Sequence, residues 1–193
     1  MKKKPKFLLL GWDSADWKVI NPLIDRGEMP ALESLINKGV MGNIATLDPP
    51  LSPMLWTSIA TGKYAYKHGV HGFLEKSKED NKMRAVTNDS IQTSTLWQIL
   101  NKHGFKTNIV GWWPSHPANK LNGAQVSNFY AKAGKESKWH NWKTVPKSIY
   151  PEEMAEILNP LRVHPGELGI EQLSSFIPNY KDLSKDDVKL VNL

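Results

Sequence analysis

Short apolar runs alternate with helical patterns through the first two thirds of the chain. Apolar runs predict strands, the first of them buried on both faces, over residues 6–12, 40–47, 105–113 and 124–128. Apolar positions spaced three and four apart predict helices over residues 16–25, 30–38, 52–61 and 95–103, the last of them capped by Ser94. Pro22 suggests that the first helix is kinked or divided in two. This alternation predicts an α/β fold with a mostly parallel central sheet and helices on both faces.

The pattern changes near residue 130. Residues 131–148 are polar and rich in lysine, and short amphipathic helices are expected over 151–158, over 167–176 and from 186 onward. We therefore divide the chain into a core over residues 6–130 and a polar, mainly helical insertion or cap segment over 131–193. Because the sequence stops partway into an apolar helix, we expect the domain to be truncated.

The composition says more about which metal ligands and partners are possible than about the fold. The 193 residues contain 40% hydrophobic residues and eight tryptophans, which suits a globular domain. There is no cysteine, so a metal must be held by His, Asp, Glu or hydroxyl oxygen. The net charge of +6 is scattered over many lysines, and we find no sequence-reading motif, so a solvated surface is favoured over nucleic-acid binding.

The first ten residues imitate a signal peptide, with lysines followed by an apolar run. That run, Phe7-Leu8-Leu9-Leu10, is shorter than a signal h-region, and no stretch is long enough to span a membrane. We expect a soluble cytoplasmic protein without a membrane or nucleic-acid partner.

Ser52 and Pro53 stand at the expected start of the helix that closes on Gly62. Proline suits the first helical position and serine the position before it. A hydroxyl there lies at the positive end of the helix dipole, where an anion would also bind. By itself, the Ser-Pro pair favours a simple helix cap.

Asp13 follows the first expected strand, at the edge where open α/β sheets place their ligands. If Asp13 and Ser52 meet at that edge, a divalent cation bound by both oxygens would explain the carboxylate and stabilise the serine alkoxide. Such an alkoxide attacks phosphorus or sulfur and forms a covalent intermediate that water releases.

Several motifs in order carry a resemblance to a known family. They are Gly11-Trp12-Asp13, Gly27-Glu28-Met29-Pro30, Pro49-Pro50-Leu51-Ser52-Pro53, Trp56-Thr57-Ser58, Thr61-Gly62-Lys63 and His68-Gly69-Val70. Over residues 6–130 the chain resembles the start of the alkaline phosphatase superfamily, and within it the type I phosphodiesterase/nucleotide pyrophosphatase group. The nine residues from Ser52 to Thr61 match the spacing from that family's nucleophile to its Thr-Gly pair.

The resemblance implies roles for three of these positions. Asp13 would bind one of two metals, usually zinc, with manganese or magnesium as other possibilities. Ser52 would be the nucleophile and would also touch a metal, whereas His68 belongs to a structural His-Gly dipeptide. The expected substrate is a small-molecule phosphate ester or a related compound, and monoester, diester, sulfate and phosphonate chemistry all remain open.

Two departures from the family pattern limit what the resemblance implies. Phe73 stands where nucleotide pyrophosphatases have an asparagine that holds phosphoryl oxygens, so a nucleotide substrate is not supported. The chain also lacks the Asp-His pair and the later ligands that complete the two-metal site. A catalytic metal usually takes at least three protein ligands. We therefore expect the N-terminal part of a hydrolase, inactive as this chain alone.

Other candidate residues have plainer interpretations. His68 and His71 have the spacing of a metal clip, but a turn with exposed imidazoles is favoured. Trp112 and Trp113 could line a pocket, but packing in the core is favoured. No role is assigned to His103, His116 or His164. The alternative function is a non-catalytic phosphate- or protein-binding module, and a basic nucleic-acid binder ranks below both.

Overall fold

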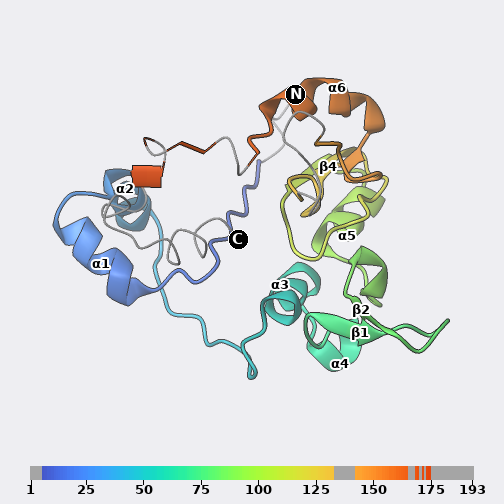
Figure 1. The fold of residues 1–193 in the computed structure, drawn as a ribbon. Helices are drawn as coiled ribbons and strands as arrows, with labels where there is room; N and C mark the ends of the chain where they lie inside the picture. Colours follow the sequence, from blue (N-terminus) through green and yellow to red (C-terminus); the bar gives the residue numbers. More distant parts are fainter. Residues whose placement is uncertain (1–5, 133–141, 165–167, 170, 172, 175–193) are drawn as a thin grey trace, which may run out of the picture. The chain divides into compact units, whose positions relative to one another are not determined.

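The computed structural model describes residues 6–132, 142–164, 168–169, 171 and 173–174 (Figure 1). The chain forms two compact units, residues 1–48 and 49–193, and each is described by itself. Among the described residues, no helix combines the length and the apolar character needed to cross a membrane.

The first unit contains the two helices that the sequence predicts, α1 (Trp17–Asp25) and α2 (Pro30–Lys38). The Asp16 side chain caps α1 by accepting a 2.8 Å hydrogen bond from the backbone N–H of Lys18. The helix runs on across Pro22, so the expected division into two pieces is wrong. α2 begins at a proline and ends at Gly39, as the start and stop signals predict.

The two strands expected in this unit are absent from the described residues. Residues 6–12 and 40–47 have no strand assignment, and their apolar side chains are exposed, with Leu8 at 83% and Ile44 at 96%. An apolar run becomes a strand only when a neighbour supplies backbone hydrogen bonds and covers its side chains. Neither condition is met here, and the prediction of two strands is wrong for this chain.

The second unit contains a small mixed sheet of three strands. β3 (Thr107–Val110) pairs in parallel with β4 (Gly123–Val126), which pairs antiparallel with β5 (Ile149–Tyr150). Gly123 is required at the β3–β4 pairing, because a Cβ there would come within 1.9 Å of the Thr107 carbonyl oxygen. The α/β class is confirmed, with shorter strands than the apolar runs suggested.

Helices precede and follow this sheet in the chain. They are α3 (Ser52–Thr61), α4 (Ala65–His68), η1 (Asn88–Ser90), α5 (Leu96–Lys102), η3 (Glu152–Met154), α6 (Ala155–Leu158) and η4 (Asn159–Leu161). η3 and α6 confirm the helical prediction for 151–158, and η4 follows directly after them. The helix expected over 167–176 lies in part, and the helix expected from 186 wholly, outside the described residues.

The core of the second unit lies where α3, α5 and β3 pack together. Ala60, Trp97 and Ile109 form a buried cluster, against which Trp112 and Leu121 pack. Thr95, rather than Ser94, is the N-cap of α5, and it forms a capping box with Gln98. This reciprocal cap fixes the start of the helix that carries Trp97 into the core.

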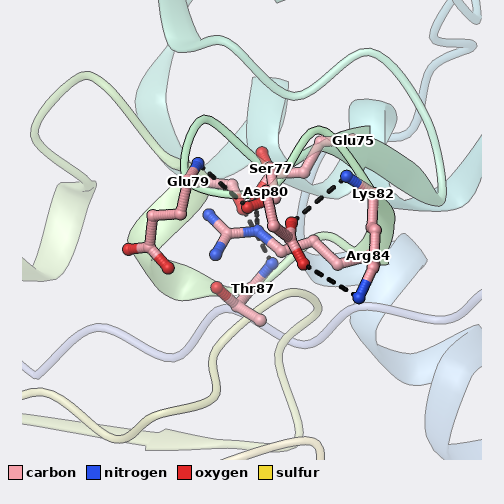
Figure 2. A network of polar contacts seen from close by, with 8 residues as sticks. Glu75, Ser77, Glu79, Asp80, Lys82, Arg84 and Thr87 are labelled. Atoms are coloured by element: carbon pink, nitrogen blue, oxygen red, sulfur yellow. Dashed lines mark hydrogen bonds and ion pairs between the residues drawn. The ribbon is translucent and has the colours of Figure 1, made fainter.

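A hairpin of β1 (Leu74–Lys76) and β2 (Met83–Ala85) occupies a highly charged and mostly exposed segment. Figure 2 shows its polar network, in which the carboxylate of Glu75 accepts a hydrogen bond from Arg84 Nε at 3.0 Å. The same oxygen accepts a bond from the Ser90 hydroxyl at 2.8 Å, and Ser90 in turn accepts from the Thr87 N–H. These bonds fasten the hairpin to the turn that follows it.

Candidate active site

Ser52 is the first residue of α3 and is half-buried. The N-cap position belongs to Leu51, whose backbone is extended (φ −94°, ψ 119°) and which makes no side-chain cap. The interpretation of Ser52 as a simple helix cap is therefore wrong by one residue. Its hydroxyl lies in the first turn, where backbone N–H groups have no acceptor within the helix and favour an anion.

The body of α3 holds Ser52 on a rigid support. The buried hydroxyl of Thr57 donates to the Pro53 carbonyl at 2.6 Å, and that of Thr61 donates to the Thr57 carbonyl at 2.7 Å. Gly62 then ends the helix in the left-handed conformation, with φ of 64°. The nine-residue spacing from Ser52 to Thr61 is thus the length of one helix.

His68 fastens the loop that follows α3. Its side chain is fully buried, and its Nδ1 accepts the backbone N–H of Val70 at 3.1 Å. The neutral ring therefore carries its proton on Nε2, which lies 3.0 Å from the Ser58 hydroxyl and donates to it. Ser58 donates onward to the Met54 carbonyl at 2.9 Å. Both ring nitrogens are committed, so the metal-clip interpretation is wrong and the structural assignment of His68 is confirmed. The expected exposure of the two imidazoles holds for His71 and is wrong for His68, which is buried.

Asp13 lies in an exposed turn of the first unit, just before α1. Because Ser52 belongs to the second unit, its meeting with Asp13 stays a prediction. Within the described residues, no group of three or more His, Asp and Glu side chains is arranged to hold a metal ion. These residues do not fit a complete metal centre.

A hollow of about 530 Å³ lies in the second unit at the carboxyl ends of the parallel strands β3 and β4. Gly111 and Trp113 follow β3, whereas Asn128 and Phe129 follow β4. The other lining residues come from the hairpin and from the segment after β4: Phe73, Ala85, Val86, Ala131 and Lys132. Ligands of open α/β sheets bind at this edge.

The two adjacent tryptophans have different roles. Trp112 packs on the core and donates its indole N–H to the Trp56 carbonyl at 3.1 Å, which confirms the core interpretation for this residue. Trp113 lines the hollow, so the core interpretation is wrong for it. Sequence reasoning missed Asn128, Phe129 and Lys132, although their place at the end of a predicted strand or shortly after it was the available signal.

His116 lies half-buried beside the hollow. Its ring stacks on Phe129 with centroids 4.5 Å apart, and its Nδ1 lies 3.3 Å from the Ser127 hydroxyl. Burial lowers the pKa of His116, and burial followed by the nearby charge of His71 lowers the pKa of His68. Both side chains therefore favour the neutral form in the folded protein.

This preference predicts that the protein loses stability in mild acid. In the unfolded chain both histidines take up a proton near pH 6.5, whereas the folded state resists protonation. The free energy of unfolding is therefore expected to be highest above pH 6.5 and to fall as the pH is lowered from 7.5 to 5.0. Urea unfolding across that range measures it, and His116→Asn should reduce the slope. A free energy that rises toward pH 5.0 would contradict the prediction.

Comparison with known proteins places the chain in a family. The family described as "Type I phosphodiesterase / nucleotide pyrophosphatase" matches residues 7–168, a longer stretch than the motifs alone suggested. Neither the curated proteins nor the solved structures gave a significant match. The match covers α1 to η4 and includes Asp13, Ser52 and the hollow. The chain belongs to the type I phosphodiesterase/nucleotide pyrophosphatase family.

Proposed function

We propose that this chain is the N-terminal part of a metal-dependent phosphoric-ester hydrolase in which Ser52 is the nucleophile. The observation that carries the proposal is the position of Ser52 at the first residue of α3, with the cap position occupied by Leu51. A serine with this placement is not needed to cap the helix. Pro53 has no N–H, and the Leu55 N–H donates to the Leu51 carbonyl at 3.0 Å. The Met54 N–H is therefore the group after Ser52 that can hold a phosphoryl oxygen as negative charge develops on it.

The expected metal ligands come from Asp13 and Ser52, with zinc as the proposed metal. The family is generally metal-dependent. A bound cation would supply charge that stabilises the serine alkoxide and the phosphoryl group. The sequence holds no Asp-His pair, and its aspartates after Ser52 are Asp80, Asp89, Asp182, Asp186 and Asp187. Because two ligands leave a catalytic metal incompletely held, we propose that the chain alone is inactive.

Assay of the 193-residue chain with bis(4-nitrophenyl) phosphate and either Zn²⁺ or Mn²⁺ tests both parts of the proposal. We expect no release of nitrophenolate above that of the metal salt alone. Turnover abolished by Ser52→Ala but kept by Ser94→Ala, an exposed serine of the same unit, would support the nucleophile and contradict the inactivity. Turnover that survives Ser52→Ala would overturn the assignment of the nucleophile.

The coding DNA beyond codon 193 offers a second test. An open frame that continues into an Asp-His pair and a later histidine would supply the missing ligands. An extended protein should then hydrolyse the same diester, with Ser52→Ala lowering kcat by a factor of about 10³ or more, as expected for loss of a nucleophile. A stop codon at that point would favour the phosphate- or protein-binding module instead.

A further inference from the structure

The hollow at the carboxyl edge of β3 and β4 has the character of a site for a planar apolar group. Its volume of about 530 Å³ falls in the range of about 300–1,000 Å³ that is usual for small-molecule sites. Three aromatic rings contribute to its wall, from Phe73, Trp113 and Phe129. Phe73 and Trp113 meet edge to face with centroids 5.3 Å apart, which leaves part of their surface available, and Phe73 is 45% exposed.

The rings are held in place from both sides of the hollow. The backbone N–H of Val86 donates to the Phe73 carbonyl at 3.0 Å, so the aromatic wall is an extension of the β1–β2 hairpin. On the other side, the side-chain oxygen of Asn128 accepts hydrogen bonds from the backbone N–H groups of Ser115 and His116, each at 3.0 Å. These bonds fix the segments that carry Trp113 and Phe129. The hollow is therefore a built feature of the unit.

The charge at the hollow is positive. The ammonium group of Lys132 lies 4.4 Å from the centre of the Phe129 ring, and none of the described residues that line the hollow carries a carboxylate. The nitrogen of the Asn128 amide takes part in none of the hydrogen bonds found among the described residues, which involve only the side-chain oxygen. A cation and an amide donor beside aromatic rings suit a ligand that joins a ring to an anion.

The residue before Phe73 lies next to the start of α3. A Cβ added at Gly72 would come within 3.3 Å of Leu51 Cδ1, so the residue before Phe73 packs against the residue before Ser52. Phe73 replaces the asparagine that holds phosphoryl oxygens in nucleotide pyrophosphatases, and it presents a ring instead. The aromatic wall is thus connected to the start of α3 through Gly72.

We infer that this hollow binds the aromatic group of an aryl phosphoric or phosphonic ester. Ring binding follows from the hollow itself, and the assignment of that ring to the substrate rests on the proposed function of Ser52. The ring would lie among Phe73, Trp113 and Phe129, and Lys132 would attract the anionic group attached to it.

Binding to the 193-residue chain, measured by titration in NMR or calorimetry without any turnover, tests the inference. The probe is phenylphosphonate, which joins a ring to an anion; methylphosphonate lacks the ring, and benzyl alcohol lacks the charge. We expect phenylphosphonate to bind at least tenfold more tightly than either control. Equal affinity for phenylphosphonate and methylphosphonate would overturn the inference.

Variants locate the binding. Phe73→Ala should weaken phenylphosphonate binding about tenfold or more, because the variant loses an aromatic side chain on which the ring of the ligand stacks. Tyr66→Ala, which removes an exposed ring on α4, should leave binding unchanged. Lys132→Gln should lower the affinity and its dependence on salt. Unchanged binding in Phe73→Ala, with the fold verified by circular dichroism, would contradict the inference.

Two further variants separate this inference from the proposed hydrolase. Trp113→Phe keeps an aromatic wall, so binding should persist while the ligand-dependent change of tryptophan fluorescence is reduced. Ser52→Ala should keep the preference for the ring. Ring-dependent binding with a failed nucleophile test would leave the hollow as a binding site alone, whereas a supported nucleophile without ring-dependent binding would overturn only the present inference.

Discussion

Trp97→Ala is expected to lower the free energy of unfolding of the second unit by about 3–5 kcal/mol. Trp97 is 6% exposed and belongs to the buried cluster with Ala60 and Ile109. Its ring also meets Trp112 edge to face, with centroids 5.7 Å apart, a contact worth about 0.5–1.5 kcal/mol beyond burial. Truncation removes these contacts and leaves a cavity between α5, α3 and β3. Urea unfolding followed by far-ultraviolet circular dichroism measures the loss.

Trp97→Phe provides the matched control for this prediction. The buried indole Nε1 of Trp97 has no hydrogen-bond partner among the described residues, so phenylalanine keeps an apolar ring and removes an unsatisfied donor. We expect a loss of less than about 1.5 kcal/mol. Lys102→Ala, at an exposed position of the same helix, should change stability by about 0.5 kcal/mol or less. A phenylalanine variant as unstable as the alanine variant would show that the indole N–H is bonded after all.

The helices were predictable because their signals are local. Pro30 and Gly39 mark the two ends of α2, and Ser52 and Gly62 mark those of α3, within one residue of the structure. A cap or a left-handed glycine acts within a single turn, so it can be identified without knowledge of the fold. The remaining error lies in the choice of the capping residue, such as Thr95 in place of Ser94.

The strands were harder to predict because pairing is a long-range property. Residues 105–113 and 124–128 contain β3 and β4, which pair with each other, whereas residues 6–12 and 40–47 have equally apolar sequences and form no strand. The difference lies in the presence of a paired neighbour, and a single apolar run carries no information about its neighbour. The β1–β2 hairpin was missed because its segment is charged and not apolar. Hydrogen bonds of Glu75 with Arg84 and Ser90 hold it in place.

The candidate site was predictable only in part. The position of Ser52 and the structural role of His68 follow from motifs whose residues are close in sequence. The hollow joins Phe73, Trp113 and Phe129, which lie far apart in the sequence and come together only when the hairpin meets the edge of the sheet. No local pattern distinguishes Trp113 from Trp112, because their difference is the face on which each lies.

His68→Ala is expected to lower the free energy of unfolding by about 3 kcal/mol, because it removes a buried ring and leaves buried polar groups unpaired. The backbone N–H of Val70 would lose its acceptor, and the Ser58 hydroxyl would lose its donor. Both groups lie where α3 meets the loop after α4, so the local loss weakens the support of Ser52. Urea unfolding at pH 7.5, where the ring is neutral, isolates this effect from titration.

His71→Ala is the matched control, since His71 is an exposed histidine three residues away; we expect a change of about 0.5 kcal/mol or less. A double-mutant cycle with Ser58→Ala tests the hydrogen bond itself, and we expect a coupling of about 1 kcal/mol between the two side chains. Equal stability of the His68→Ala and His71→Ala variants would contradict the structural role. A large loss without coupling to Ser58 would instead assign the stability to packing and to the Val70 bond, because the cycle cancels every contact that the two side chains do not share.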